Sequence, residues 1–381
     1  MKFEWVKWKR NPKNGLLLVL LVLVFSVQLA EHWDSSTRLG EGDYTELKAM
    51  GEEIQPPQNY TGSSEPYKML HHLNEAGEPR SDKDKEQYQR VVSVLYLLED
   101  ENAARRNGQD ELRLQLQSER LVLQIAYMEA GGTEWQLLSR KDAEKQLARN
   151  HWLMERGLTI EELTTSPKGA YFLYSFLQWW MSIGGAVLLV GFLFFDYLTS
   201  EYERSNYLLL AVQPTSRRKR YFNKMQTAAV ILVVLVLGGV ILSYTIASLL
   251  FGSGSINYPI LIEYASGFGF IPLGEYLVKA IVLQLLYMLF LLQFLFLLSE
   301  IIRKSLEVLG VFLFLLLVPN ILLPFIADAG AGRWIPFLYM DVHTYITETN
   351  GFFHSPLFSI IVLLLGNIVL WKLGVWVVKK R

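Results

Sequence analysis

Six long runs of apolar residues, separated by polar stretches, are the strongest pattern in this chain of 381 residues. They occupy positions 16–30, 171–195, 227–251, 276–299, 306–327 and 357–378. At a rise of about 1.5 Å per residue, a hydrocarbon core of roughly 30 Å needs about 20 helical residues. The last five runs reach that length, and the first is marginal. The pattern predicts six transmembrane helices.

The first run, from Leu16 to Ala30, has two interpretations. The basic stretch KWKRNPK precedes it, as in the n-region of a secretory signal peptide. The sequence VQLAEHW offers a poor cleavage site, because Gln28 rather than a small residue lies two positions before Ala30. We therefore expect an uncleaved first span, with a signal peptide as the alternative.

Basic residues form four clusters near the ends of the predicted spans. The clusters are Lys2, Lys7, Lys9, Arg10 and Lys13; Arg217, Arg218, Lys219, Arg220 and Lys224; Arg303 and Lys304; and Lys379, Lys380 and Arg381. Six spans place all four clusters on one side, and positively charged loops stay on the cytoplasmic side. We expect a multi-pass protein of the plasma membrane with both termini in the cytoplasm. Residues 31–170 and the loops 252–275 and 328–356 then face outwards.

The segment 31–170 is polar and acidic. It holds 26 Asp and Glu against 17 Lys and Arg, a net charge of −9, whereas the rest of the chain holds 11 against 19, a net of +8. Apolar residues recur every three or four positions in 82–107, which predicts a helix. Further helices are expected from Asp110 to Met128, although its opening alternates like a strand, and from Thr133 to about Arg156. Residues 31–81 are expected to be mostly loop.

These patterns predict an all-α integral membrane protein with a mostly helical extracytoplasmic domain inserted between transmembrane helices 1 and 2. Residues 1–30 form the cytoplasmic tail and first helix, and residues 31–170 form the outer domain. Residues 171–381 form a five-helix transmembrane domain with a cytoplasmic loop at about 199–224.

The chemistry that the sequence lacks narrows the function. The chain has no cysteine, which excludes disulfide frameworks, zinc ribbons, iron–sulfur clusters and cysteine nucleophiles. It contains no G-x-x-x-x-G-K-[ST] motif, the phosphate-binding P-loop, and no H-E-x-x-H or G-x-S-x-G motif, which are typical of metalloproteases and hydrolases. A net charge of −1 argues against a nucleic-acid binder. We expect no catalytic, cofactor or metal site in this chain.

Four polar residues within the predicted spans or directly at the start of one are candidates for a substrate path, because polar groups in a membrane are costly. They are Glu275, Lys279, Asn320 and Asn367. Glu275 and Lys279 are four positions apart, so they can pair on one face of a helix. A structural anchor is the alternative role of that pair.

The segment 195–224 reads FDYLTSEYERSNYLLLAVQPTSRRKRYFNK. Glu201, Glu203 and Arg204 supply charge, and Tyr202 with the leucines 208–210 supplies apolar area. An interfacial helix is one interpretation. The stretch is short and acidic at its start, so a groove on a cytoplasmic partner fits the pattern better.

This segment resembles that of the permease subunits of ABC exporters of the second type. The family pattern is an acidic helical loop after the second span, a leucine-rich stretch, then Pro-x-Ser-Arg and a basic return. Here these read Glu201-Tyr-Glu203, LLLAVQP and PTSRRKRYFNK. The stretch RWIPFLYMDVHTYITETNG is similar to the family's Pro-Phe-x-Tyr region. The presence of an outer domain between the first and second spans matches one branch of the family. The sequence of that domain, residues 31–170, carries no signature of the family.

The resemblance implies that the 199–224 loop is a coupling helix that sits in a cleft of a cytoplasmic ABC ATPase. Its contact residues would be Glu201, Tyr202, Glu203, Arg204, Leu208, Leu209 and Leu210. ATP and Mg would be bound by that partner ATPase. A second permease, identical or paralogous, would complete the path through the membrane lipid. Peptides, antimicrobials or lipid-like molecules would be exported or extracted.

Other functions stay open. The chain could be a membrane-anchored sensor of an extracellular ligand, a structural scaffold, or an importer of the same superfamily. A membrane-embedded enzyme is a further alternative. Its outer-face candidates are Glu263, Asp328, Asp341 and His343.

Overall fold

A computed structural model describes residues 2–53, 82–131, 139–203, 216–264, 266–314, 334–349 and 355–380, and these are mostly helical. The chain divides into two compact units. The first, the bundle unit, comprises Met1–His32, Leu163–Ile256 and Ile260–Arg381. The second, the inserted unit, comprises Trp33–Glu162 with Asn257–Pro259.

The bundle unit is built around long apolar helices. They are α2 (Pro12–Glu53, of which Pro12–Ser35 is apolar), α8 (Gly185–Glu203), α10 (Arg217–Phe251), α11 (Leu273–Ile302) and α15 (Pro356–Lys380). Within the described residues, these five are long and apolar enough to cross a membrane. The sixth expected span, 306–327, begins in α12 (Ser305–Leu313), and most of it lies outside the described residues.

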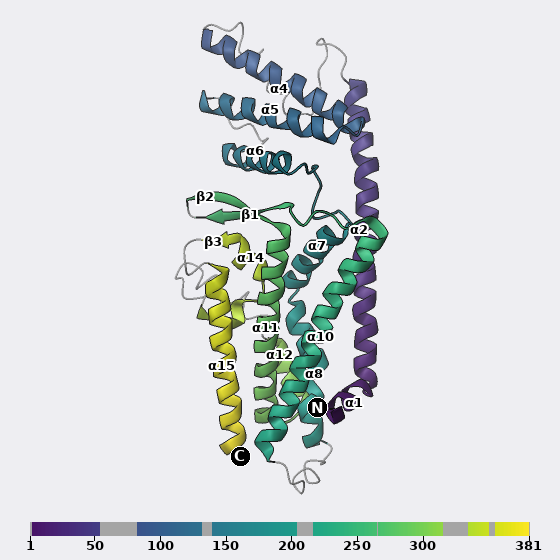
Figure 1. The fold of residues 1–381 in the computed structure, drawn as a ribbon, viewed down its shortest axis with the longest axis vertical. Coiled ribbons are helices and arrows are strands. Elements are labelled where there is room, and N and C mark those ends of the chain that lie inside the picture. The colour runs from purple at the N-terminus through teal and green to yellow at the C-terminus, as the bar shows by residue number, and fades with distance from the viewer. Residues whose placement is uncertain are drawn as a thin grey trace. The chain divides into compact units, whose positions relative to one another are not determined.

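Two of these helices form the centre of the bundle. About half of the most apolar stretch of α8 and α11 is buried, 56% and 50%, against 6% in α2, 17% in α10 and 22% in α15. Figure 1 shows α11 beside α15 and α10. The outer helices thus present apolar side chains on their exposed faces, as helices in contact with lipid do.

The bundle unit has two distinct ends. Figure 1 shows the N-terminal helix α1 (Lys2–Lys9), the beginning of α10 and the end of α15 at one end. We call it the basic end, because the residues 217–220 and 379–380 are basic. At the other, the sheet end, strands β1 (Pro259–Tyr264), β2 (Gly267–Pro272) and β3 (Glu348–Thr349) form a sheet of order β2-β1-β3. The sequence pattern did not indicate these strands.

The expected single helix over 171–195 is wrong, because two helices occupy it. They are α7 (Gly169–Ser182) and α8, and the helical structure is interrupted at Ile183 and Gly184. Gly184 has φ +66°, a conformation that residues with a Cβ rarely adopt. At Gly185 a Cβ would lie 2.3 Å from the ring of Trp180. Both positions therefore require glycine for the chain to turn from α7 into α8.

The expected loop from residue 31 is also wrong as far as Glu53, where α2 ends. The chain has no proline between Pro12 and Pro56. Without a residue that removes a backbone donor, the helix that begins in the apolar run continues into the polar sequence. Residues 54–81 lie outside the described part of the chain.

The inserted unit contains α4 (Asp82–Arg106), α5 (Asp110–Glu129) and α6 (Arg140–Glu155), which confirms helices in all three expected places. A buried ion pair of 2.9 Å joins Arg120 Nε of α5 to Glu101 Oε2 of α4. Asn150 of α6 donates to Gln117 of α5 at 2.9 Å. These contacts fix the order α4, α5, α6 within this unit.

Two short helices complete the sheet end of the bundle unit. They are the 3-10 helix η4 (Pro336–Leu338) and α14 (Val342–Thr347). The Asp341 carboxylate accepts from the backbone N–H of His343, so it caps the start of α14.

Candidate functional site

The last two turns of α8 carry a series of polar side chains, each of which contacts another helix of the bundle unit. We call them the α8 anchor, comprising Asp196, Thr199, Glu201, Tyr202 and Glu203. The anchor lies at the basic end, directly before residues 204–215, which are outside the described residues.

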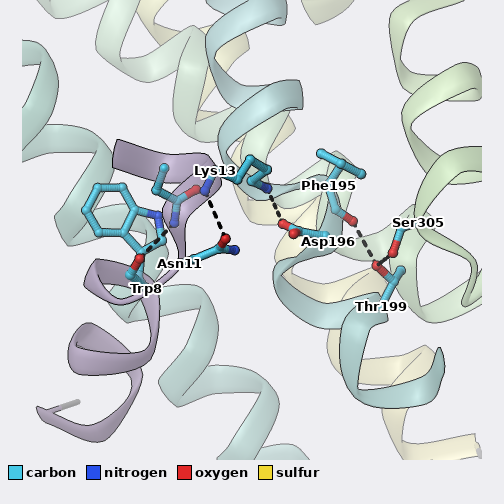
Figure 2. Close-up of polar contacts among 8 residues, drawn as sticks. Trp8, Asn11, Lys13, Phe195, Asp196, Thr199 and Ser305 are labelled. Atoms are coloured by element: carbon cyan, nitrogen blue, oxygen red, sulfur yellow. Dashed lines mark hydrogen bonds and ion pairs between the residues drawn. The ribbon is translucent and has the colours of Figure 1, made fainter. Parts of the chain in front are cut away.

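Asp196 joins α8 to the beginning of α2. Its carboxylate forms an ion pair with Lys13 Nζ, and that ammonium also lies 4.4 Å from the centre of the Phe195 ring. Figure 2 shows the Lys13 side chain directed at Asp196 from the first turn of α2. In that turn, Asn14 Nδ2 donates to the carbonyl oxygen of Trp8 at 2.9 Å. The polar contacts therefore fix where α2 starts relative to α8.

Thr199 and Glu203, one turn apart on α8, both contact Ser305 at the start of α12. The hydroxyl oxygens of Thr199 and Ser305 are 2.7 Å apart. Figure 2 draws this contact between α8 and α12. Glu203 Oε1 accepts from the Ser305 backbone N–H at 2.6 Å. The first N–H groups of a helix have no partner within it, and a carboxylate there also complements the helix dipole. Glu203 thus caps α12 from another helix.

Glu201 pairs with Lys224 of α10. The side chains are 15% and 5% exposed, so the pair is largely removed from water. A buried charge that loses its partner costs about 3–5 kcal/mol, whereas an apolar pair of the same size is often tolerated. The pair therefore imposes one register between α8 and α10.

Tyr202 contacts the end of α11. Its hydroxyl donates to the two oxygens of Glu300 at 3.1 and 3.0 Å, and Glu300 is buried. The guanidinium of Arg303 lies 5.1 Å from the centre of the Tyr202 ring. Arg303 ends α11 with φ 62°, which costs an L-residue about 1–2 kcal/mol. Strain of this kind persists where surrounding contacts hold it, and the Tyr202 ring supplies one such contact.

The anchor can transmit force, because α8 is joined at one end to α2, α10, α11 and α12. A displacement applied where the chain leaves Glu203 reaches four other helices through short, directional contacts. The described residues contain no group of three or more His, Cys, Asp or Glu side chains placed to hold a metal ion.

The structure describes three of the expected coupling residues. Glu201 and Tyr202 face other helices, whereas Glu203 is exposed although its Oε1 is engaged by Ser305. The other four lie outside the described residues, namely Arg204, Leu208, Leu209 and Leu210. Sequence reasoning did not anticipate that Lys13, Lys224, Glu300 and Ser305 would join this site.

The expected substrate-path residues lie apart from one another. Glu275 and Lys279 pair at 2.6 Å near the start of α11, which confirms their predicted pairing. Asn367 of α15 accepts from Gln293 Nε2 at 2.6 Å and donates to the Leu286 carbonyl oxygen, so it joins α15 to α11. Gln293 is 18 positions beyond Glu275, or about 27 Å along a helix axis. Asn320 is outside the described residues.

Three of the four outer-face candidates for enzyme chemistry are described. Glu263 of β1 is paired in register with Glu348 of β3. His343 Nδ1 lies 2.8 Å from the Tyr276 hydroxyl of α11. Burial lowers the pKa of the His343 imidazole below its ordinary value, against a smaller opposite influence of the Asp341 carboxylate. Asp328 is outside the described residues.

Comparison with known proteins identifies a family but no function. No curated protein and no solved structure matches the chain. One family model, described as a protein of unknown function (DUF2705), matches residues 164–381. That match covers every helix of the bundle unit from α7 onwards, including the whole α8 anchor. Because it spans more than half of the sequence, the chain belongs to the DUF2705 family.

Proposed function

We propose that this chain is the permease subunit of an ATP-driven ABC exporter, powered by separate ATPase subunits in the cytoplasm. The observation that carries the proposal is the α8 anchor. The segment that resembles a coupling helix leaves α8 at Glu203, where side chains of α8 contact α2, α10, α11 and α12.

A coupling element has to move several helices together. If residues 204–215 were connected to α8 alone, a push from a partner would bend one helix end. The anchor instead holds α8 by two ion pairs and by hydrogen bonds to the start of α12 and the end of α11. ATP binding in the partner then shifts the bundle between two arrangements, provided that the nucleotide-bound partner prefers one of them.

The partners follow from what this chain lacks and exposes. The chain has no P-loop, so ATP and Mg bind to the partner ATPase. The apolar exposed faces of α2, α10 and α15 contact membrane lipid and a second permease, which is identical in a homodimer or paralogous in a heterodimer. Nucleic acid is not a partner.

The orientation follows from charge. The basic end faces the cytoplasm, in keeping with the positive-inside rule, and both termini lie on that side. The inserted unit is extracytoplasmic, and the net charge of −9 over residues 31–170 favours a cationic or amphipathic substrate. Peptides, antimicrobials and lipid-like molecules have this chemistry, and the complex exports them or extracts them from the outer leaflet.

A pull-down tests the proposal. The tagged full-length chain is purified from its native membrane in mild detergent, and bound proteins are identified by mass spectrometry. We expect a stoichiometric partner with a Walker A motif, lost in Leu209→Asp and retained in the matched control Leu112→Asp, an exposed leucine of α5. A stable preparation without an ATPase in several detergents would overturn the proposal.

A further inference from the structure

The side chain of His343 is the centre of a polar cluster at the sheet end of the bundle unit. It is contributed by α14, and two long-range contacts connect it to other helices. Its Nδ1 is 2.8 Å from the Tyr276 hydroxyl of α11, and Gln178 Nε2 of α7 lies 3.1 Å from its Nε2 and 3.2 Å from its Nδ1. The rings of Tyr174 and Tyr276 pack edge-on against the imidazole, with centroids 6.3 and 5.6 Å away.

The donor and acceptor roles require a neutral imidazole. The amide nitrogen of Gln178 can only donate, so one of the two ring nitrogens that it contacts has to accept. A neutral ring has one accepting nitrogen and one N–H group, and the Tyr276 hydroxyl at Nδ1 can serve either of them, because a hydroxyl both donates and accepts. In this orientation the Gln178 nitrogen also donates to the Tyr174 hydroxyl at 2.9 Å. The neutral imidazole satisfies both neighbours.

A second proton breaks this match. It would leave no accepting nitrogen in the ring, so the N–H group of Gln178 would face ring N–H donors at 3.1 and 3.2 Å. The charge would also sit in a site that two tyrosine rings shield from water.

The surrounding ionisable groups offset that charge only in part, through the Asp341 carboxylate. The other ionisable residues of α14 and of the elements packed against it, α15 apart, are Tyr171 and Tyr174 of α7, Glu275, Tyr276, Lys279, Tyr287 and Glu300 of α11, Asp341 before α14, Tyr345 of α14, and Glu348 of β3. The Asp341 carboxylate is engaged by the His343 backbone N–H at 3.1 Å and by the Thr344 hydroxyl at 2.9 Å. Glu275 and Lys279 pair with each other, and Glu348 is exposed. From Pro356 to Trp371, α15 has no ionisable residue.

We propose that His343 is a proton-binding latch: the neutral imidazole ties α14 to α7 and α11, and uptake of a proton releases α14. The proposal does not depend on the transport function, since it concerns contacts within the bundle unit alone. Its consequence is that acidification loosens the sheet end, including β3, which follows α14 directly.

The absence of cysteine from the chain makes a clean test possible. A single nitroxide label is attached to the full-length protein through Glu348→Cys, at the exposed position that follows α14. Electron paramagnetic resonance then reports the mobility of the label at pH 7.5 and pH 5. We expect an immobile label at pH 7.5 and a mobile label at pH 5.

Three variants in this labelled background separate the latch from other effects of pH. His343→Gln keeps a donor and an acceptor but does not titrate, so its label should remain immobile at both values. His343→Lys, which carries a fixed charge, should be mobile at both. His151→Gln, an exposed histidine of α6, should respond like the parent.

The outcomes decide the proposal even if His343→Lys fails to fold. A label that is equally immobile at both pH values in the parent would overturn it, and so would a pH response that persists in His343→Gln. Histidine NMR of isotopically labelled protein provides a second readout. The resonance that is absent from His343→Gln should titrate below the ordinary histidine value of about 6.5, and titration at or above that value contradicts the latch.

Discussion

Glu203 Oε1 accepts a hydrogen bond of 2.6 Å from the backbone N–H of Ser305, 102 residues further along the chain. The last residue of α8 in this way caps the first turn of α12. Helix caps are usually supplied from within a few residues, so a cap from another helix also joins the two elements. This contact lies at the point where the proposed coupling segment begins.

Removing this cap should destabilise the bundle. We expect Glu203→Ala to lower the free energy of unfolding by about 1 kcal/mol, the usual cost of a lost helix cap. Thermal unfolding in detergent measures the change. Glu144→Ala in α6 is the matched control, because its pair with Arg140 is an exposed contact within one helix. Equal effects of the two substitutions would show that Glu203 caps nothing of consequence.

The Glu201–Lys224 pair should be strongly non-additive. Lys224→Met removes the ammonium that faces the largely buried Glu201 carboxylate, so we expect a loss of up to about 3–5 kcal/mol. The double variant that adds Glu201→Leu removes both charges and should recover most of the lost free energy of unfolding. A double-mutant cycle of unfolding free energies measures the coupling, and two effects that simply add would refute a buried ion pair.

Glycine positions report how closely the helices approach. At Gly374 of α15 an added Cβ would lie 2.5 Å from the Tyr221 hydroxyl oxygen of α10. Gly374→Ala should therefore destabilise the bundle, as overpacking does, by about 1–3 kcal/mol. Gly238→Ala in α10 is the control, because nothing lies within 4 Å of its Cβ position. It should leave stability unchanged or improve it by about 0.5–1 kcal/mol. Thermal unfolding measures both variants, and a Gly374→Ala protein more stable than Gly238→Ala would contradict this packing.

Stability should fall on acidification through His343. The pKa of this imidazole is lower in the folded protein than in the unfolded chain, so the unfolded chain binds more protons as the pH falls. The contribution is complete above about pH 6.5, the value of an unperturbed histidine, and is lost as the pH falls through the folded value. Thermal midpoints at pH 7.5 and 5 should differ less in His343→Gln than in the parent. An unchanged difference assigns the pH dependence to other groups.

The sequence predicts those helices that are encoded by the local pattern of apolar residues. The helix α4 follows from apolar spacing, and α10, α11 and α15 follow from apolar runs of span length. The break between α7 and α8 was missed, because Gly184 and Gly185 in an apolar run are equally typical of close helix packing. The continuation of α2 to Glu53 was missed because polar composition was taken as loop, although no proline interrupts it.

The α8 anchor was only partly predictable. The acidic residues after the second apolar run drew attention to Glu201 and Glu203, but their partners depend on tertiary structure. Tyr202 and Glu300 are 98 positions apart, and Lys13 and Asp196 are 183 apart. Opposite charges near the ends of different spans are a signal for such pairs. Without the packing of the helices, that signal does not say which charges meet.

A substitution at Asn367 can distinguish a structural role from a role in transport for one of the expected path residues. Its amide group contacts α11 through Gln293 and the Leu286 carbonyl oxygen. Asn367→Leu should cost about 1 kcal/mol, as lost hydrogen bonds between membrane helices do. Stability is measured by thermal unfolding, and transport by substrate release from vesicles. A loss of transport at unchanged stability would favour the substrate path instead.

The central claim is that the end of α8 passes a partner's movement to the bundle. It is tested most directly by the distance between two spin labels in the purified complex with the proposed ATPase. The labels are placed through Leu306→Cys of α12, at the basic end, and Leu357→Cys of α15, both exposed in a chain without other cysteines. We predict that ATP with Mg shifts the distance distribution, and that Leu209→Asp abolishes the shift. An unchanged distribution while the ATPase is bound and loaded with nucleotide would contradict the account.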